Sequence, residues 1–301
     1  MKRAIFMLLG VCACQGAPVA DAELPAMTQV FAGFDAYDAL GVQGGLVSAE
    51  ISGSGVVACP VGGCEAPTVV AWSDSYVSGE LPVVDASGDR AIATGLVYPS
   101  WVATSGARTF VAEDSFSYDE TPARVDSVAD DGTVTPWIQG VGGGTYGLLA
   151  DAANVYVLVD DPTLSSVQLL ACATSHPCFS EPRVLLGDLD QTITAQQLAS
   201  DGVAVYVARA LVRDVVRINA SGNVTTILPA TDATALVWDA ATNALWFGTS
   251  AGSVGRVSAD GTMRTYVAHG AGAIHAIATD ATSVYVSTGE SGELVMRAPK
   301  S

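Results

Sequence analysis

One short pattern recurs along this chain and constrains its fold more than any other feature. A turn residue precedes an alternating run of β-branched, aromatic and small residues, which is typical of β-strands. The pattern occupies segments 108–113, 154–159, 204–209, 244–249 and 283–288. The turn positions before these segments are spaced by 46, 50, 38 and 41 residues, at Ser105, Asp151, Asp201, Asp239 and Asp280. A period of this size predicts repeated units that each form one small β-sheet.

A second pattern follows several of these strands. Segments 125–138, 215–228 and 254–267 each contain a strand, a turn with glycine and another strand, which is the signature of a β-hairpin. About four strands in a repeat of about 40 residues is typical of a β-propeller blade. The sequence therefore predicts an all-β fold, a β-propeller of four-stranded antiparallel blades.

The number of blades follows from the outermost strand of each repeat. These strands are expected at 27–32, 67–71, 133–138, 182–186, 224–228 and 262–267, which predicts six blades. Seven blades remain open, because the segment from Trp72 to Val97 is either an excursion between two blades or a degenerate blade.

The two ends of the chain are expected to meet. The last repeat ends with 294–301, which matches only a third strand, so its outermost strand is missing. Residues 26–32 resemble 262–268 in length and alternation. We therefore expect the N-terminal segment to pair with the last blade and close the ring, giving a single propeller domain over 26–301.

The first residues have the pattern of an export signal. Lys2 and Arg3 precede an apolar run to Ala13, which is shorter than the about 20 residues that span a bilayer. The residues before Cys14 resemble a bacterial lipobox, which predicts a lipoprotein-type signal peptide over 1–13, lipidation of Cys14 and a linker over 14–25. The protein is then held in the cell envelope by a lipid anchor and faces the periplasm or the exterior. Cleavage after Ala22 is the alternative, and it predicts a soluble secreted protein.

Four further cysteines occur as two close pairs, Cys59 with Cys64 and Cys172 with Cys178. In an exported protein, close pairs predict two small disulfide loops. A four-cysteine zinc site would have to unite distant segments, and neither pair has the C-x2-C spacing common in such sites.

The charge of the chain limits its partners. Acidic residues number 31 against 13 basic residues, a balance that repels phosphate backbones and anionic lipids. We expect no nucleic-acid binding, membrane attachment only through the lipid anchor, and a monomer.

The innermost strands suggest where a ligand would bind. Alignment on the shared turn places one hydrogen-bonding residue at the same position of each blade: Tyr37, Ser100, Tyr146, Gln196, Thr234 and His275. Trp101 is expected beside this ring. Ligand sites favour concave openings with convergent polar groups, so these residues are the predicted ligand-binding set. A water-filled channel without a specific ligand is the alternative.

The segment 244–268 resembles a repeat of the NHL and streptogramin-lyase type of propeller. The whole plan of signal, lipobox and cysteine hairpins resembles uncharacterised propeller lipoproteins of myxobacteria. The lyase resemblance implies a histidine and a glutamate from neighbouring blades with magnesium, and His275 and Glu290 are the candidates here. The lyases have another histidine in the neighbouring blade, but the position one blade before His275 is Thr234 in this chain.

Two functions from different classes remain open. The first is a non-enzymatic module of the cell envelope that binds an envelope protein or a small ligand. The second is a metal-assisted lyase or hydrolase, with His275 and Glu290 as the residues to test. A purely structural envelope protein without a small ligand is a third possibility. No cofactor or metal site is predicted from the residues, although a divalent cation in the channel remains open.

Overall fold

The structure is a computed structural model. It describes residues 27–32, 37–43, 46–51, 55–64, 68–72, 83–84, 91–93, 99–105, 108–113, 123–129, 131–160, 166–179, 181–190, 193–262, 264–269, 272–289 and 294–300. The signal segment 1–13, Cys14 and the linker 14–25 lie outside these ranges.

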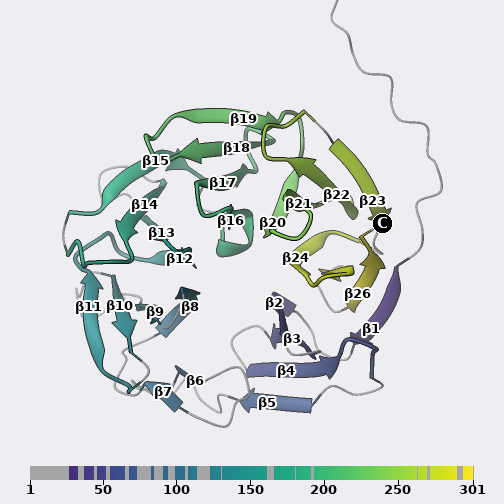
Figure 1. Ribbon diagram of the computed structural model, residues 1–301, viewed down its shortest axis with the longest axis horizontal. Coiled ribbons are helices and arrows are strands. Elements are labelled where there is room, and N and C mark those ends of the chain that lie inside the picture. Colours follow the sequence, from purple (N-terminus) through teal and green to yellow (C-terminus); the bar gives the residue numbers. More distant parts are fainter. Residues whose placement is uncertain are drawn as a thin grey trace, which may run out of the picture.

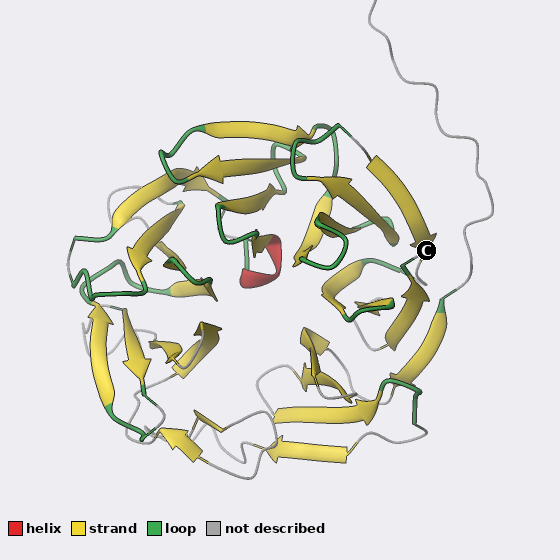
Figure 2. Cartoon of the chain, in the orientation of Figure 1, coloured by secondary structure: helices red, strands yellow, loops and turns green. Residues whose placement is uncertain are grey.

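The described part of the chain forms six antiparallel sheets of four strands and one sheet of two strands. Figure 1 shows the four-stranded sheets arranged around a common centre, with β2, β8, β12, β16, β20 and β24 innermost. Figure 2 shows that strands dominate and that helix is confined to one short segment, the 3-10 helix η1 (Ala195–Gln197).

The first three sheets follow the chain in order. The first contains β2 (Tyr37–Gln43), β3 (Leu46–Ile51), β4 (Gly55–Pro60) and β5 (Thr68–Trp72). The second contains β8 (Pro99–Ser105), β9 (Arg108–Glu113), β10 (Arg124–Val128) and β11 (Val134–Ile138). The third contains β12 (Thr145–Ala150), β13 (Asn154–Asp160), β14 (Val167–Ala173) and β15 (Arg183–Leu189).

The remaining sheets repeat the same order with one exception at the chain ends. The fourth contains β16 (Leu198–Ser200), β17 (Ala204–Arg209), β18 (Asp214–Asn219) and β19 (Val224–Leu228). The fifth contains β20 (Ala233–Asp239), β21 (Ala244–Thr249), β22 (Ser253–Ser258) and β23 (Arg264–His269). The sixth contains β24 (Ile274–Thr279), β25 (Ser283–Thr288), β26 (Leu294–Pro299) and the N-terminal β1 (Thr28–Ala32).

The strand β1 is the outermost strand of the sixth sheet. It pairs antiparallel with β26, with Thr28 opposite Arg297 and Ala32 opposite Leu294. Val30 is buried in an apolar cluster that also contains Tyr285 of the sixth sheet and Val47 of the first. The two ends of the chain therefore share one sheet, and that sheet packs against the first.

The apolar core lies between neighbouring sheets. Leu158 of the third sheet and Ile218 of the fourth belong to one buried cluster, and Trp246 of the fifth and Val284 of the sixth belong to another. Successive side chains of a strand point to opposite faces of its sheet, and neighbouring sheets cover both of these faces. This explains the near-continuous apolar runs such as residues 155–159, which are all buried.

The repeated aspartate explains why the period is so clear in the sequence. Asp201 Oδ1 accepts hydrogen bonds from the amides of Val203 and Ala204, and its Oδ2 accepts one from Tyr206 Oη at 2.7 Å. Asp151 and Asp280 make the same contacts with Tyr156 and Tyr285. An aspartate that accepts from its own following amides fixes a tight turn. The turn and the strand after it are therefore specified together.

Both predicted disulfides are present, Cys59 with Cys64 and Cys172 with Cys178. Each joins the end of the third strand of its sheet, at Cys59 in β4 and Cys172 in β14, to the connection that leads to the fourth strand. Each connection also contacts the outer strand of the preceding sheet: Cys64 N donates to Val30 O at 3.1 Å, and Cys178 N donates to Trp137 O at 3.1 Å. The cross-linked loops thus join sheets as well as strands.

Two local features were not predicted from the sequence, and only the second differs from an expected strand. The segment between Trp72 and Val97 contains a two-stranded sheet of β6 (Val83–Val84) and β7 (Ala91–Ala93). Gln196 lies in η1 and not at the start of an inner strand, because Gln197 N donates to Thr194 O and Thr194 N donates to Gln197 Oε1, both at 3.0 Å. This tight turn replaces the first residues of the expected strand. Within the described ranges, no helix is long and apolar enough to cross a membrane.

Candidate functional site

The topology gives the molecule two faces that carry different turns. Strands alternate in direction within each sheet, so the beginnings of the innermost strands, the turns between the second and third strands, and the ends of the outermost strands share one face. We call this the upper face. The aspartate turns and the disulfide connections share the other, which we call the lower face. Ser100, Tyr146, Thr234 and His275 occupy the upper part of the inner strands.

Several predicted ligand-binding residues use their polar groups to join strands. Ser100 Oγ lies 2.8 Å from Thr145 Oγ1 of the next sheet and donates to Ala112 O at 3.2 Å. Trp101 Nε1 donates to Thr145 O at 3.3 Å. Thr234 Oγ1 likewise donates across to the next sheet, to Ile274 O at 2.5 Å. At two interfaces the polar ring therefore joins neighbouring inner strands.

The other ring residues are placed differently. Tyr146 Oη donates to Asp160 Oδ1 at 2.9 Å, within its own sheet. His275 Nε2 lies 3.3 Å from Gly289 O, also within its own sheet. Gln196 is partly buried in η1. The side chain of Tyr37 and the whole of Glu290 lie outside the described residues.

A pocket of about 460 Å³ lies on the upper face between the third and fourth sheets. Its walls come from the end of β15 and from the turn between β17 and β18, and its lining includes Ser166, Asp188, Asp190, Ile193, Leu211 and Val212. This volume is within the range of ligand pockets in proteins. Sequence alignment of the repeats did not indicate this pocket.

One wall of the pocket is the turn between β17 and β18, which has exposed apolar side chains and internal hydrogen bonds. Leu211 is 79% exposed and Val212 is 59% exposed. Arg213 N donates to Arg209 O at 2.8 Å, and Arg209 forms two hydrogen bonds with Asp214, at 2.8 and 2.6 Å. These hydrogen bonds raise the pKa of Arg209, while its partial burial acts in the opposite direction. The turn is ordered before any partner arrives, so its exposed aliphatic side chains are preorganised.

The other wall is acidic and follows a β-bulge. Val167 pairs with Leu189 and Leu169 with Leu186, so β15 carries one extra residue at this point. Asp188 lies in the bulge with φ of 57°, a conformation that aspartate adopts more readily than most residues. Bulges redirect side chains, and this one contributes Asp188 to the pocket lining beside Asp190.

The interior of the pocket contains a buried hydroxyl. Ser166 is 7% exposed, and its Oγ has no hydrogen-bond partner among the described residues. A buried polar atom without a partner is costly, so a ligand group that bonds to it gains that energy back.

One sequence signal could have identified this region. The turn after 204–209 carries Leu211 and Val212, whereas the equivalent turn of the next repeat carries Ser250, Ala251 and Gly252. Two exposed aliphatic residues in a turn where the next repeat has only small residues mark a surface with another role. Within the described residues, no group of three or more His, Cys, Asp and Glu side chains could hold a metal ion.

Comparison with known proteins identifies the fold. No protein-family model matches the chain, and no curated protein matches it. Among solved structures, regucalcin from Agrobacterium tumefaciens, described as a calcium-binding protein, is 10% identical, with 91% of this chain and 93% of that chain covered and a TM-score of 0.55. BamB from Moraxella catarrhalis is 14% identical, with coverage of 90% and 99% and a TM-score of 0.50.

A chain from a structure of the mitotic checkpoint complex is 12% identical, with 99% of each chain covered and a TM-score of 0.63. At such low identity these likenesses show the fold alone. Regucalcin and BamB are both propeller proteins. The chain is therefore an all-β protein of four-stranded antiparallel sheets with the β-propeller fold.

Proposed function

We propose that this chain is an exported, lipid-anchored propeller of six blades that binds a protein partner through its upper face. Six four-stranded sheets support the blade count, and the pairing of β1 with β26 supports closure of the ring by the N-terminal strand. The cluster that Val30 shares with Val47 and Tyr285 supports closure as well, because it joins the first sheet to the sixth.

The cell envelope is the proposed location. The two disulfides are compatible with an oxidising compartment outside the cytoplasm, where such bonds persist. The basic and apolar residues before Cys14 support export and lipid attachment. The resemblance of the whole plan to propeller lipoproteins of myxobacteria agrees with this location.

The observation that carries the binding function is the pocket beside the turn with Leu211 and Val212. Exposed aliphatic side chains on a rigid turn provide apolar contact area, and aspartates beside them favour a cationic group. Arg209 also lines the pocket, but its charge is balanced by Asp214 at 2.6 Å. The proposed partner is a protein segment in which a lysine or arginine lies next to an aliphatic residue.

Photo-crosslinking in the cells that make the protein tests this function. A photo-reactive phenylalanine analogue replaces Val212 in one strain and Val203 in another. Both valines are exposed in turns of the same sheet, but Val203 lies on the lower face. We expect a discrete adduct from position 212, none from position 203, and a weaker adduct at 212 when Asp188→Asn and Asp190→Asn are added. Equal adduct yields from the two positions would contradict the proposal. So would a yield at position 212 that does not change when the two aspartates are replaced.

A further inference from the structure

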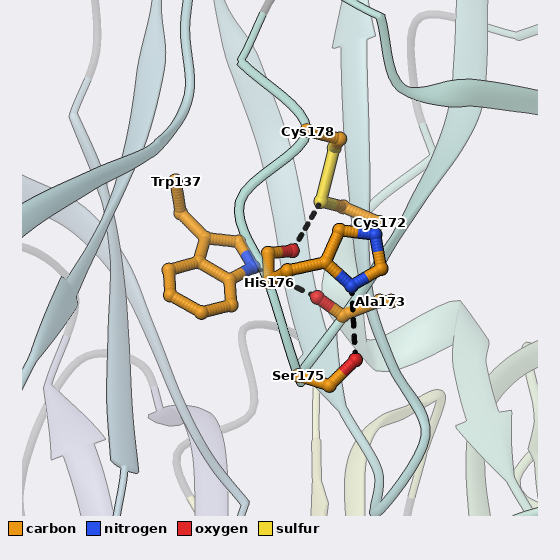
Figure 3. Close-up of a disulfide and its surroundings, with 6 residues drawn as sticks. All are labelled: Trp137, Cys172, Ala173, Ser175, His176 and Cys178. Carbon is orange, nitrogen blue, oxygen red and sulfur yellow. Dashed lines mark hydrogen bonds between the residues drawn. A yellow bond between two sulfur atoms is a disulfide. The ribbon is translucent and has the colours of Figure 1, made fainter.

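A second pocket lies on the lower face, and it shares no lining residue with the pocket of the proposed function. The connection after β14, which the Cys172–Cys178 disulfide ties to that strand, closes a pocket of about 300 Å³ against β10 and β11. The lining residues are Arg108, Ser127, Ala129, Thr133, Thr135, Trp137, Ser175, His176 and Pro177. Figure 3 shows Ser175 and His176 on this connection, beside the disulfide and near the indole of Trp137.

The chemistry of this lining is opposite to that of the chain as a whole. Acidic residues outnumber basic ones by 31 to 13, yet the described residues that line this pocket include Arg108 and His176 and no carboxylate. Ser127, Thr133, Thr135 and Ser175 add hydroxyl groups, which can donate hydrogen bonds. Cationic and hydroxyl donors around a small cavity are the groups that bind an oxyanion.

Arg108 is held by a ring contact, and no carboxylate of the described residues forms an ion pair with it. Its guanidinium carbon lies 4.8 Å from the centre of the Trp137 ring, which holds the side chain by a cation–π contact. Within the described part of the chain, the guanidinium of Arg108 has no hydrogen bond or ion pair. Arg124 and Arg209, by contrast, are bound to Glu113 and Asp214. Arginine stacked on an aromatic ring keeps its in-plane N–H groups available for a two-point contact with an oxyanion.

The loop that supplies Ser175 and His176 is held on three sides. Trp137 Nε1 donates to Ala173 O at 3.0 Å, and Cys178 N donates to Trp137 O at 3.1 Å. The Cys172–Cys178 disulfide closes the loop (Figure 3), and Ser175 Oγ lies 3.0 Å from His176 Nδ1. The donors are thus ordered before an anion arrives, which lowers the entropy cost of binding.

We propose that this pocket binds a small tetrahedral oxyanion, a phosphate or sulfate group, between Arg108 and His176. The Cys172–Cys178 disulfide acts as a positioning element, because it fixes the loop that presents His176. This site is separate from the upper face and does not depend on the proposed function.

Titration of the folded, oxidised domain with sodium sulfate and with sodium phosphate tests the proposal. Ionic strength is kept constant with sodium chloride, and the reporters are the NMR signals of the Trp137 indole N–H and the His176 ring. We expect saturable shifts at both reporters. A third titration uses glycerol 3-phosphate, a phosphate monoester. Saturable shifts with this compound would show that the site binds monoesters as well as free anions. If the shifts do not saturate, the site binds free anions alone. A response that does not saturate with sulfate or phosphate overturns the proposal.

Variants separate this site from general charge effects. Arg108→Gln should weaken binding by about tenfold, the loss of one charge-assisted contact, and His176→Gln should weaken it severalfold, the loss of one hydrogen-bond donor. Arg183→Gln is the matched control, because Arg183 is exposed and donates to Ala220 O away from the pocket. If Arg108→Gln does not fold, Arg108→Lys keeps the charge without the planar fork and should weaken binding severalfold. Equal affinity in folded variants at position 108 and in the wild type would overturn the assignment.

The two disulfides provide a second matched comparison. Replacing Cys172 and Cys178 by serine should weaken sulfate binding severalfold, because the loop loses its cross-link. The same change at Cys59 and Cys64 should leave binding unchanged, since that loop lies against Val30 of another sheet. Near-UV circular dichroism shows whether each variant is folded. Equal weakening by the two pairs would overturn the role of the Cys172–Cys178 loop.

Discussion

Lys300 Nζ lies 2.6 Å from Asp239 Oδ2, and both side chains are only 6% exposed. Lys300 Nζ also donates to the carbonyl of Asp280, so the last described residue joins the aspartate turns of the fifth and sixth sheets. Burial by itself raises the pKa of Asp239, but hydrogen bonds from Lys300 and Thr242 together with the lysine charge lower it overall. Asp239 is therefore held as a carboxylate by its neighbours.

Lys300→Met should destabilise the whole domain. Removing one partner of a buried ion pair leaves an uncompensated charge, which costs about 3–5 kcal/mol in the free energy of unfolding. Equilibrium urea unfolding measures the change. The double variant with Asp239→Asn should lose less than the single variant, because the charge left behind is also removed. A single variant within about 0.5 kcal/mol of the wild type would show that the pair is not needed.

The N-terminal strand should be needed for stability. Val30 is 3% exposed in the cluster between the first and sixth sheets, so Val30→Asp buries a charge without a partner and should cost about 3 kcal/mol or more. Gln29→Asp is the control, because Gln29 is exposed on the same strand. Thermal unfolding compares the two variants. Similar midpoints for both would exclude a structural role for the packing of β1.

Stability should fall as pH rises from about 4 to about 7 because of Asp126. Burial, a hydrogen bond with Glu113 and its negative charge raise the pKa of Asp126 to about 7, although Arg124 acts against this. The unfolded carboxyl titrates near about 4, so between about pH 4 and 7 the folded state binds more protons than the unfolded state. The free energy of unfolding therefore decreases over this window and levels above it. In Asp126→Asn the free energy of unfolding should depend less on pH over this window. Urea unfolding at several pH values measures this dependence, and a dependence equal to that of the wild type contradicts the assignment.

Cys14 should carry the lipid if the lipobox interpretation is right. Metabolic labelling with radioactive palmitate, followed by precipitation of the protein, should give a labelled band for the wild type and for Cys12→Ser. Cys14→Ser should abolish the label, since the thioether forms on that sulfur. Label retained in Cys14→Ser, or a soluble wild-type protein cleaved after Ala22, would exclude the anchor at Cys14.

His275 separates the binding function from the enzymatic alternative. Its Nε2 lies 3.3 Å from Gly289 O, so His275→Ala removes one hydrogen bond and should lower the free energy of unfolding by about 1 kcal/mol. Crosslinking at position 212 should be unchanged, because the pocket contains no group from the sixth sheet. Assays of lyase and hydrolase activity with magnesium accompany this test. Turnover that is present in the wild type and lost in a folded His275→Ala protein would favour an enzyme.

Much of the fold could be predicted from local sequence. The repeated aspartate accepts hydrogen bonds from amides two and three residues later and from a tyrosine five residues later, as Asp201 does with Tyr206. These contacts lie within one turn and one strand, so they leave a regular period in the sequence. The close cysteine pairs are local in the same way. The N-terminal strand was predictable because β1 has the length and alternation of the other outer strands.

Only the tertiary structure decided which polar and charged groups remain available for ligands. Ser100 and Thr234 occupy equivalent ring positions, and both are bonded to the neighbouring sheet, to Thr145 and to Ile274. Each pocket lies between two sheets, where a bulge or a loop of one sheet faces a turn or a strand of the other. Asp188 and Leu211, for example, line the same pocket from different sheets. Such contacts join residues of different repeats and have no sequence period. Alternation and turn chemistry therefore determined the strands, whereas packing between sheets determined the candidate sites.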